Sequence, residues 1–332
     1  MARLRLIENA AEGPQPDGER KASPDAEALD AYSSLVVSVA KQLTPSVASL
    51  RLTAGGGRRG SGSGVSVTPD GYLLTSAHVI DGFKAGRAEF IDGSDLAFEV
   101  IGSDPLSDLA VIRVRGEVAP AVLGDADRLQ VGQLVVAIGN PMGYGGSVTA
   151  GVVSGLHRSL STRQGSASRI VENVIQTDAA LNPGNSGGAL ADGRARLIGI
   201  NTAVAGMGLG LAVPINATTL KILGSLLQSG RVRRGYLGVA GGRRPLPRAL
   251  ARVLDREAGV EILEVVAGSP AERAGLHVGD IILDLDGRPI QGAGDLQRLM
   301  VDEIIGRDLP ARIIRGGEYL NLTLTPAELP AR

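Results

Sequence analysis

The stretch QLVVAIGNPMGYGGSVTAGVVSG, residues 133–155, carries the pattern that decides the fold. It holds two short runs rich in valine and alanine or isoleucine, separated by the turn-forming residues Gly, Asn and Pro. The same alternation of short apolar runs and turns fills residues 47–214, without an intervening segment of helical period. The other runs are VASLRLT, GVSVTPDGYLL, LAVIRV, RLIGINTAV and LGLAVPI. We therefore expect an all-β barrel or sandwich here, and not a parallel βαβ architecture.

A second, smaller unit follows. Asn216 is a suitable N-cap for a helix over TTLKILGSLLQSG, which ends at Gly230, and RVRRG (residues 231–235) is typical of a linker. Beyond the linker, strand-like GVEILEVV, DIILDLDG and YLNLTLTP accompany the turn SPAERAGL and a helical GAGDLQRLMVDEI. This mixture predicts a small α+β domain.

The N-terminal thirty residues mix Pro, Gly and both charge signs without an apolar block, so we expect a disordered tail. They lack the apolar segment of a secretory signal, which predicts a cytoplasmic location for the chain as written. The apolar run at residues 35–40 predicts a short amphipathic helix that ends before Pro45, and it is far too short to span a membrane. The expected divisions are a tail at 1–30, a first domain at 31–230 and a second at 236–328.

Composition narrows the class of protein. The chain has 332 residues, enough for about two domains, with 34 Lys and Arg against 35 Asp and Glu. Without net positive charge, a nucleic-acid partner is not expected. Cysteine is absent, which excludes disulfides, thiolate metal sites and a cysteine nucleophile. The only histidines are His78, His157 and His277, and His157 has no partner at recognisable metal-ligand spacing, so we expect no metal site.

Three patterns in the first unit carry the residue types of nucleophilic catalysis: TSAHV (residues 75–79), DPLSDLAV (104–111) and NPGNSGG (182–188). A serine hydroxyl needs an imidazole to accept its proton, and the imidazole needs a carboxylate to fix its tautomer. The patterns supply Ser186, His78 and Asp108 for these roles. The glycines around Ser186 allow a sharp turn in which the backbone N–H groups of Gly184 and Ser186 converge on a developing oxyanion.

Each pattern also has an ordinary interpretation: a packed histidine, an aspartate in a turn, a serine in a glycine-rich loop. The Gly-x-Ser-x-Gly pattern further fits the nucleophile elbow of an α/β-hydrolase. Chain order separates the two enzyme classes, because elbow families run Ser, then Asp or Glu, then His. This chain runs His78, Asp108, Ser186, and the only later histidine, His277, lies in the second unit.

Residues about 34–330 resemble the HtrA (Deg) family of trypsin-like serine proteases with one PDZ domain. The similarity is carried by LLTSAHVI, DPLSDLAVI and IQTDAALNPGNSGGAL, with AIGNPMG and GLGLAVPIN beside them. The resemblance implies a mainly β fold, in which a chymotrypsin-like double β-barrel of two six-stranded barrels precedes an α+β PDZ domain. It implies that His78, Asp108 and Ser186 form a catalytic triad between the barrels, with Gly184, Asn185 and Ser186 at the oxyanion hole.

The same resemblance implies a pocket for the substrate residue before the scissile bond. No acidic residue stands at these positions, so we expect a preference for small or medium aliphatic side chains over Lys or Arg. The expected pocket residues are Leu181, Gly208, Leu209, Gly210 and Leu211.

The segment Tyr236, Leu237, Gly238 and Val239 resembles the carboxylate-binding loop of a PDZ domain. Successive backbone N–H groups there can hold a terminal carboxylate while a peptide adds as a strand to the sheet edge. RRPLP, residues 243–247, is expected to be a basic loop near this groove. Residues 156–170 fall where the family has a sensor loop, and Arg158 matches the position that couples PDZ occupancy to the oxyanion hole. A solvated loop charge is an equally open interpretation of Arg158.

As a whole, the resemblance implies an ATP-independent serine endopeptidase that needs no cofactor. Its partners would be unfolded or misfolded polypeptides, C-terminal peptides at the PDZ groove, and two further copies in a homotrimer. A catalytically inert, peptide-binding chaperone or adaptor is the alternative from another class. The family works mostly outside the cytoplasm, so a periplasmic location stands beside the cytoplasmic one.

Overall fold

The first of two closed barrels is formed by the strands that carry His78 and Asp108 on their connections. The computed structural model of the chain describes residues 24–53, 59–140, 146–164, 167–182, 184–204 and 209–329. In the first barrel the strands are hydrogen-bonded in the order β1-β2-β3-β6-β5-β4. Their bounds are β1 (Val47–Thr53), β2 (Arg59–Ser66), β3 (Tyr72–Thr75), β4 (Ala85–Glu89), β5 (Asp95–Asp104) and β6 (Leu109–Val114).

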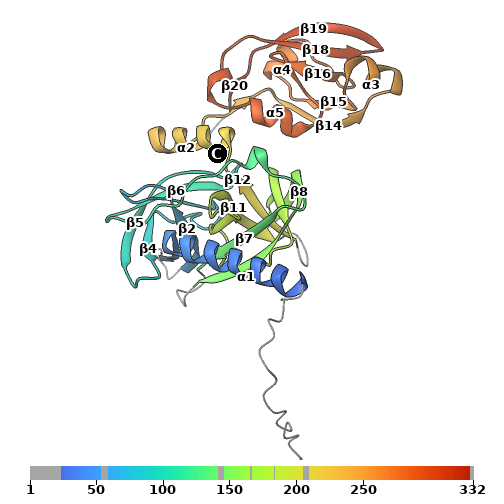
Figure 1. Ribbon diagram of the computed structural model, residues 1–332. Coiled ribbons are helices and arrows are strands. Elements are labelled where there is room, and N and C mark those ends of the chain that lie inside the picture. The colour runs from blue at the N-terminus through green and yellow to red at the C-terminus, as the bar shows by residue number, and fades with distance from the viewer. Residues whose placement is uncertain are drawn as a thin grey trace, which may run out of the picture.

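The second barrel joins its strands in the order β10-β11-β12-β9-β8-β7. Figure 1 shows the two barrels packed side by side. The core of this two-barrel unit is built mainly from Val, Leu, Ile and Ala, as the scarcity of aromatic residues requires. The strand bounds are β7 (Leu134–Gly139), β8 (Ser147–Gln164), β9 (Ala167–Thr177), β10 (Ala189–Asp192), β11 (Leu197–Val204) and β12 (Gly210–Pro214).

The fold class expected from the sequence is therefore confirmed, with two differences within the barrels. Strands β4 and β5 were not anticipated, because their alternation of charged and apolar residues gives no continuous apolar run. The segment 156–170, expected as a loop, is instead largely the paired ends of β8 and β9. The pairing supplies partners for the backbone, which the polar composition of the segment does not reveal.

Helix α2 (Ala217–Ser229) begins and ends where the sequence predicts. The side chain of Asn216 accepts a hydrogen bond from the Thr219 N–H, at 3.1 Å, and Gly230 ends the helix in a left-handed conformation with φ of 70°. Ile222 and Leu226 bury one face against the barrels. Figure 1 shows that α2 lies between the barrels and the C-terminal domain.

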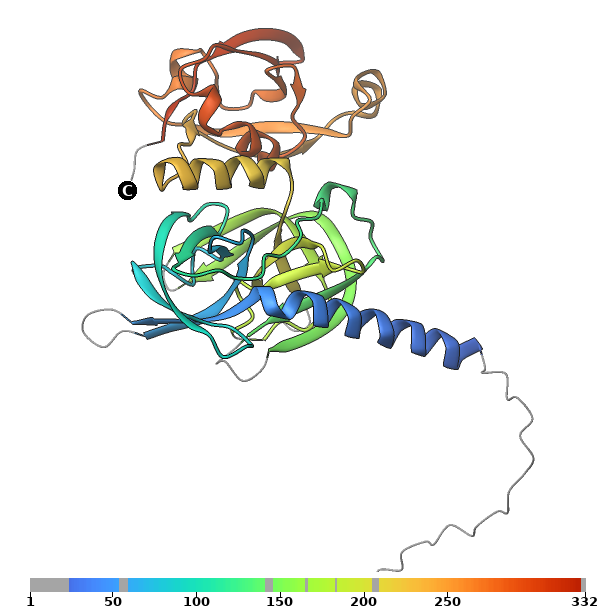
Figure 2. The ribbon, with the colours of Figure 1, turned by 60° about the vertical axis from the view of Figure 1, so that its left-hand side comes forward.

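Helix α1 (Pro24–Leu43) corrects two expectations from the sequence. It is a 20-residue helix where a short one was expected, and its first turns include residues 24–30, which were assigned to the disordered tail. Pro24 suits the first turn of a helix, and the Ala, Glu and Leu that follow are good helix formers. The helix therefore extends N-terminal to the apolar run at residues 35–40. Val39 and Leu43 are buried against the core of the barrels, and Figure 2 shows the N-terminal end projecting beyond them. A short helix, η1 (Thr44–Ser46), leads into β1.

The C-terminal domain is a sheet with strands in the order β14-β15-β16-β18-β19, with β17 paired to β16 and a separate pair β13-β20. Leu296 and Leu299 of α5 complete its core with Ile262, Ile282 and Ile313 from the sheet. The strands are β13 (Gly235–Tyr236), β14 (Val239–Pro245), β15 (Ala258–Val265), β16 (Ile281–Leu285), β17 (Arg288–Pro289), β18 (Leu309–Arg315), β19 (Glu318–Leu324) and β20 (Ala327–Glu328). The helices are α3 (Arg248–Leu254), α4 (Pro270–Arg273), α5 (Ala293–Leu299) and η5 (Asp302–Ile304), and η3 (Ala126–Arg128) lies in the barrel unit.

The RRPLP segment is not a loop for most of its length. Its first three residues end strand β14, which pairs with β15 from Val239 to Pro245. Leu246 is buried against Leu283 and Ile314, and α3 begins after Pro247. The apolar Leu246 and the fixed φ of Pro247 therefore anchor a strand-to-helix corner, which outweighs the loop-like composition. Within the described residues, no helix is long and apolar enough to cross a membrane.

Candidate active site

His78 and Asp108 meet on the first barrel. The imidazole Nδ1 lies 2.9 Å from Oδ2 and 3.1 Å from Oδ1 of Asp108. The backbone N–H of His78 also donates to Oδ1, at 3.0 Å. An ionised carboxylate only accepts hydrogen bonds, so this contact places a proton on Nδ1 and leaves Nε2 of His78 able to accept one.

The loop before β6 fixes the position of Asp108. Asp108 has a positive φ of 56°, a conformation that Asp tolerates better than most residues. Its carbonyl accepts a hydrogen bond from Ala77 N–H, at 3.1 Å, which ties the loop to the residue before His78. Asp104, four residues earlier, accepts from both the N–H and the hydroxyl of Ser107, at 3.2 and 2.6 Å. The carboxylate of Asp108 is 2% exposed, so it faces the histidine and not water.

Thr202, on β11 of the second barrel, was missed by the sequence reasoning. Its hydroxyl donates to Oδ2 of Asp108. Its carbonyl accepts the hydroxyl hydrogen of Ser186, at 2.8 Å. Thr202 therefore contacts both the Asp108 carboxylate and the Ser186 hydroxyl, from a strand that carries no sequence signal beyond an apolar run. Only the packing of one barrel on the other reveals it.

Ser186 lies at the junction of the barrels. Its carbonyl accepts a hydrogen bond from Ser63 N–H on β2, at 2.8 Å. Gly187 follows with a φ of 83°, and a Cβ there would lie 2.1 Å from the carbonyl oxygen of Ser63, so only glycine fits. His78 and Ser186 line the same open cavity of about 360 Å³. The structure thus brings the three residues of the predicted triad together, with the serine hydroxyl turned toward Thr202.

The turn before Ser186 corrects one part of the predicted oxyanion hole. The N–H of Asn185 donates to the carbonyl of Asn182, at 3.0 Å, and so is already used within the turn. Gly184 takes a φ of 99°, and its carbonyl accepts the hydroxyl hydrogen of Ser63, at 2.6 Å. Within the described parts of the chain, the N–H groups of Gly184 and Ser186 donate to no acceptor. Those two donors, without Asn185, are the ones left for an oxyanion.

The predicted substrate pocket lies on the second barrel. Leu181 is half-buried and packs against Gly210, where a Cβ would lie 3.0 Å from Leu181 Cδ1. Leu209 is exposed. Leu211 is fully buried in the core of the barrel unit, where the register of β12 with β9 directs it, so its side chain is not available to line a pocket. Gly208 lies outside the described residues.

The PDZ segment lines a second cavity, of about 610 Å³, between the two domains. Gly238 has a φ of 79°, and a Cβ there would lie 2.2 Å from Ser269 Cβ, so the loop needs glycine at this point. The carbonyl of Leu237 accepts from Ala271 N–H, at 2.9 Å, which fixes the loop to α4. Tyr236, Leu237, Gly238 and Val239 share this cavity with Leu296 and Met300 beside them, and with Leu106 and Ser107 from the peptidase unit.

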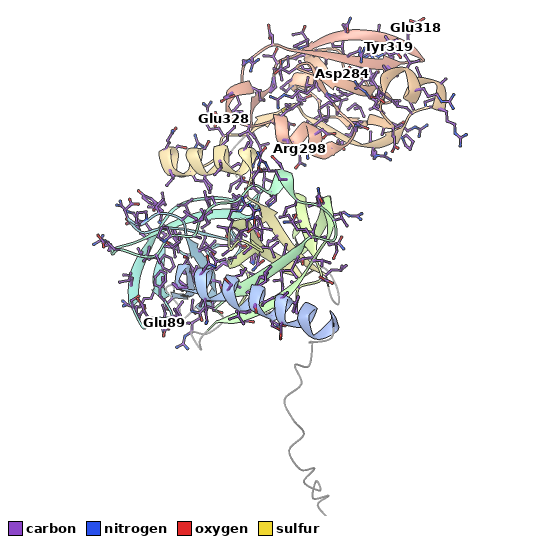
Figure 3. The ribbon with its side chains drawn as sticks, in the orientation of Figure 1. Glu89, Asp284, Arg298, Glu318, Tyr319 and Glu328 are labelled. Atoms are coloured by element: carbon purple, nitrogen blue, oxygen red, sulfur yellow. The ribbon has the colours of Figure 1, made fainter. Side chains whose placement is uncertain are left out.

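Ion pairs hold the two domains beside this cavity. Arg234, in the expected linker, pairs with Asp104 of the peptidase unit, and the two side chains are 13% and 5% exposed. Lys221 on α2 lies 3.7 Å from Glu303, at the surface. Figure 3 shows Arg298 and Glu328 on the side of the PDZ domain that faces α2. Arg233 donates to Glu328 at 2.8 Å, which lowers the pKa of that carboxyl. The segment 231–235 is therefore bound to both domains.

Arg158 lies on β8, opposite Val174 of β9, and is exposed. Its guanidinium folds over Gly155, where a Cβ would lie 2.9 Å from Arg158 Nε. The side chain of His157 lies outside the described residues. Among the side chains that the structure describes, no three His, Cys, Asp or Glu gather as ligands for a metal ion.

In the PDZ interior, burial raises the pKa of Asp280, but hydrogen bonds from Arg315 and the backbone N–H of His277 outweigh it and leave the pKa lowered. His277 therefore contributes its backbone N–H to a turn of the second unit, where the sequence places it.

Comparison with known proteins identifies both domains. Residues 62–200 match the family model of the trypsin-like peptidase domain, and residues 247–325 match that of the PDZ domain. A probable periplasmic serine endoprotease, DegP-like, of Halomonas elongata is 37% identical over 281 residues, covering 82% of this chain and 57% of the relative. The periplasmic serine endoprotease DegP of Escherichia coli K12 is 37% identical over 271 residues, covering 79% and 56%. The chain thus spans a little over half the length of these relatives.

Solved structures agree. An HtrA-type protease, AlgW, bound to a tripeptide superposes with a TM-score of 0.76 at 34% identity, covering 90% of this chain and 98% of that one. The serine endoprotease from Yersinia pestis gives a TM-score of 0.69 at 31% identity, covering 89% and 98%. With these matches, and a trypsin-like peptidase domain followed by one PDZ domain, the chain belongs to the HtrA (Deg) family of serine proteases.

Proposed function

We propose that this chain is a serine endopeptidase in which Ser186 is the nucleophile, His78 the general base and Asp108 the carboxylate that orients it. The observation that carries the proposal is the contact of Asp108 with His78 at 2.9 Å, beside a cavity that His78 and Ser186 both line. No cofactor takes part in this chemistry.

In the first step the Ser186 oxygen attacks the peptide carbonyl carbon while its proton passes to Nε2 of His78. For this attack the hydroxyl rotates away from the Thr202 carbonyl. The N–H groups of Gly184 and Ser186 stabilise the resulting oxyanion. The C–N bond then breaks as His78 returns the proton to the leaving amine, and water repeats the sequence to release the acyl group.

We further propose that C-terminal peptides regulate this activity at the PDZ groove. A terminal carboxylate would bind the backbone N–H groups of residues 236–239, with the peptide beside β14. The groove shares its cavity with Leu106 and Ser107, and Arg234 pairs with Asp104 on the same loop. That loop ends in Asp108, so an occupant of the groove touches the segment that positions the catalytic carboxylate. Arg158 remains our candidate for a second route through β8.

We propose unfolded or misfolded polypeptide as the substrate class. The pocket around Leu181 and Gly210 offers apolar contacts, which suit aliphatic side chains that a folded protein would bury. We place the protein in the periplasm, where the names of its curated relatives locate them. A homotrimer is also proposed, and analytical ultracentrifugation of the full chain tests it.

Labelling with a fluorophosphonate probe tests the triad, because an activated serine displaces fluoride from the probe and becomes phosphonylated. We expect the full chain to be labelled, and Ser186→Ala to abolish both labelling and cleavage of unfolded casein, with a loss of about 10⁴–10⁶ in rate. Ser33→Ala, an exposed serine on α1, is the matched control and keeps its label. Labelling of the Ser186→Ala protein at the same rate as the unmodified chain would refute the assignment.

Regulation needs a separate measurement. A synthetic peptide ending in an apolar residue should change the labelling rate, while the same peptide with an amidated C-terminus should not, since the loop recognises the carboxylate. Equal effects of the two peptides would contradict the PDZ proposal and leave the triad assignment untouched.

A further inference from the structure

We propose that Ser63, on β2 of the first barrel, is a positioning residue for the oxyanion hole. Its hydroxyl holds the turn of residues 184–186 in the conformation that leaves the N–H groups of Gly184 and Ser186 free for an oxyanion. This inference rests on the proposed function, because it concerns the oxyanion that forms when Ser186 attacks a substrate. Ser63 is 0% exposed, so it acts through the turn and not by touching the substrate.

Every polar group of Ser63 has a partner. Its N–H donates to the Ser186 carbonyl at 2.8 Å, and its carbonyl accepts from the Thr75 hydroxyl at 2.7 Å. Its hydroxyl donates to the Gly184 carbonyl at 2.6 Å and accepts from the Asn140 N–H at 2.9 Å. One buried residue of the first barrel therefore binds both ends of the turn 184–186 and the end of β7 in the second barrel.

The Asn140 N–H decides where the hydroxyl hydrogen of Ser63 points. A backbone N–H can only donate, so the Ser63 oxygen is the acceptor in this bond. A carbonyl can only accept, so the Ser63 hydroxyl hydrogen is used in the bond to Gly184. Asn140 directly follows β7 (Leu134–Gly139), and the second barrel thus holds its N–H in place. Backbone groups on both sides therefore fix which atom donates and which accepts at Ser63.

The bond from Ser63 fixes the peptide group between Gly184 and Asn185. Its carbonyl end is held by the Ser63 hydroxyl, and its N–H end donates within the turn at 3.0 Å. The next peptide group is held as well, because the Asn185 carbonyl accepts from Gly188 N–H at 2.9 Å. The N–H groups of Gly184 and Ser186 flank these two fixed carbonyls, and their positions follow from them.

Gly184 depends on this external hydrogen bond. Its φ of 99° lies in a region that glycine reaches readily, and glycine is also the residue that leaves it most readily. Without the Ser63 hydroxyl, the Gly184 carbonyl would lose its partner and its peptide group would turn to find another. Such a rotation moves the neighbouring N–H donors, and a displacement of about 1 Å at a catalytic site can lower the rate by about 10²-fold.

The competing interpretation is that Ser63 only joins the two barrels. A residue of that kind changes how much of the protein is folded, but the folded fraction keeps its KM, its kcat per active site and its inhibition constants. A positioning residue changes the interactions that exist only in the transition state. The two roles therefore differ in constants that do not depend on the amount of folded enzyme.

Ser63→Ala removes the hydroxyl and keeps the backbone bonds of residue 63. With a peptide anilide substrate, we expect kcat per titrated active site to fall by about 10- to 100-fold and KM to change by less than about twofold. The reason is that the oxyanion contact is absent from the bound substrate and appears only in the transition state.

A peptide aldehyde gives the second measurement. In its adduct the Ser186 oxygen bonds to the aldehyde carbon, the hydroxyl proton passes to His78, and the former carbonyl oxygen becomes an oxyanion. We expect the inhibition constant of the aldehyde to rise in Ser63→Ala by about the factor that kcat falls. The corresponding peptide acid, which binds without forming the adduct, should keep its inhibition constant.

Ser66→Ala is the matched control. Ser66 is on the same strand and is 0% exposed, but its hydroxyl donates to the Thr68 carbonyl at 3.3 Å and not to the turn. This variant also loses a buried serine hydroxyl, so thermal melts of the two variants compare the effect on stability. Its kcat and its inhibition constant for the aldehyde should equal those of the unmodified chain.

An unchanged kcat and aldehyde inhibition constant in Ser63→Ala, or equal losses in the two variants, would overturn the positioning role. Failure of Ser63→Ala to fold would overturn it too, since Ser63 would then be a structural residue. Absence of hydrolysis and of fluorophosphonate labelling in the unmodified full chain, with or without a C-terminal peptide, would instead overturn the proposed function. The two failures are therefore distinct.

Discussion

The contact between the two barrels and the contact between the peptidase and PDZ domains are built from different interactions. Between the barrels, buried hydrogen bonds join the two sides: Ser63 N–H donates to the Ser186 carbonyl at 2.8 Å, the Ser76 hydroxyl to the Asn201 carbonyl at 3.0 Å, and the Thr202 hydroxyl to the Asp108 carboxylate. Between the domains, the bonds that hold are ion pairs, such as Arg234 with Asp104 and Lys221 with Glu303.

Under the proposed function, the difference follows from what each contact has to do. Catalysis needs the nucleophile and the base in one geometry, and buried hydrogen bonds are costly to break because the freed groups lose their partners. The proposed regulation requires the interdomain contact to respond when a peptide binds. Of its two ion pairs, Lys221 with Glu303 is exposed and exchanges readily with water, whereas Arg234 with Asp104 is largely buried and ties the PDZ side to the loop 104–108. The loop 104–108 belongs to both contacts, since it carries Asp104 at one end and Asp108 at the other.

The largest effect is expected at Asp108. Asp108→Asn keeps the size of the side chain and tolerates the positive φ, but the amide no longer fixes the His78 tautomer. We expect kcat/KM for a peptide substrate to fall by about 10⁴, with little change in Tm. A fall of less than about tenfold would mean that the carboxylate does not serve the histidine.

Thr202→Val should have the next largest effect, because it removes one hydrogen bond to the buried Asp108 carboxylate without changing the size of the side chain. A hydrogen bond to a charged group contributes about 1.5–3 kcal/mol, so we expect kcat/KM to fall by about 10- to 100-fold. Thr202→Ser keeps the hydroxyl and should retain most of the activity. If serine and valine lower the rate equally, the hydroxyl is not the relevant group.

Arg234→Gln tests the interdomain contact. Loss of its pair with Asp104 should uncouple the PDZ groove from the loop 104–108. We therefore expect the change in labelling rate that a C-terminal peptide causes to become about fivefold smaller. Lys221→Gln removes an exposed pair at the same contact and serves as the control. Rates of fluorophosphonate labelling give both ratios, and an unchanged peptide response in Arg234→Gln would separate regulation from this ion pair.

The smallest effect is expected at Glu328, an exposed carboxylate that accepts hydrogen bonds from Arg233. Because its pKa is lowered from 4.5 in the folded chain, its stabilisation is present at neutral pH and is lost as the pH falls through the folded-state pKa. Glu328→Gln should therefore decrease the Tm slightly at pH 7, and thermal melts of the two proteins should converge well below pH 4.5. A difference that persists in acid would indicate a packing effect.

Local sequence signals predicted the elements that depend on neighbours along the chain. The run VASLRLT became β1, and LAVIRV became β6, with the expected bounds. Asn216 and Gly230 fixed both ends of α2. The sequence did not predict four elements, strands β4, β5 and β18 and helix α3. Their residues are mixed in polarity, and these elements are stabilised by partners elsewhere in the chain.

For the site, residue type and chain order alone selected His78, Asp108 and Ser186, because their chemistry is uncommon in combination and the chain has few histidines. Tertiary structure alone decided what surrounds them. The Thr202 hydroxyl donates to Asp108 from the other barrel, and the Asn185 N–H donates to a carbonyl within its own turn. Arg234 pairs with the loop that carries Asp108. Thr202 and Asp108 lie 94 positions apart in the sequence, and Arg234 and Asp104 lie 130 apart. Such pairs form only when distant segments pack together and bury their polar groups.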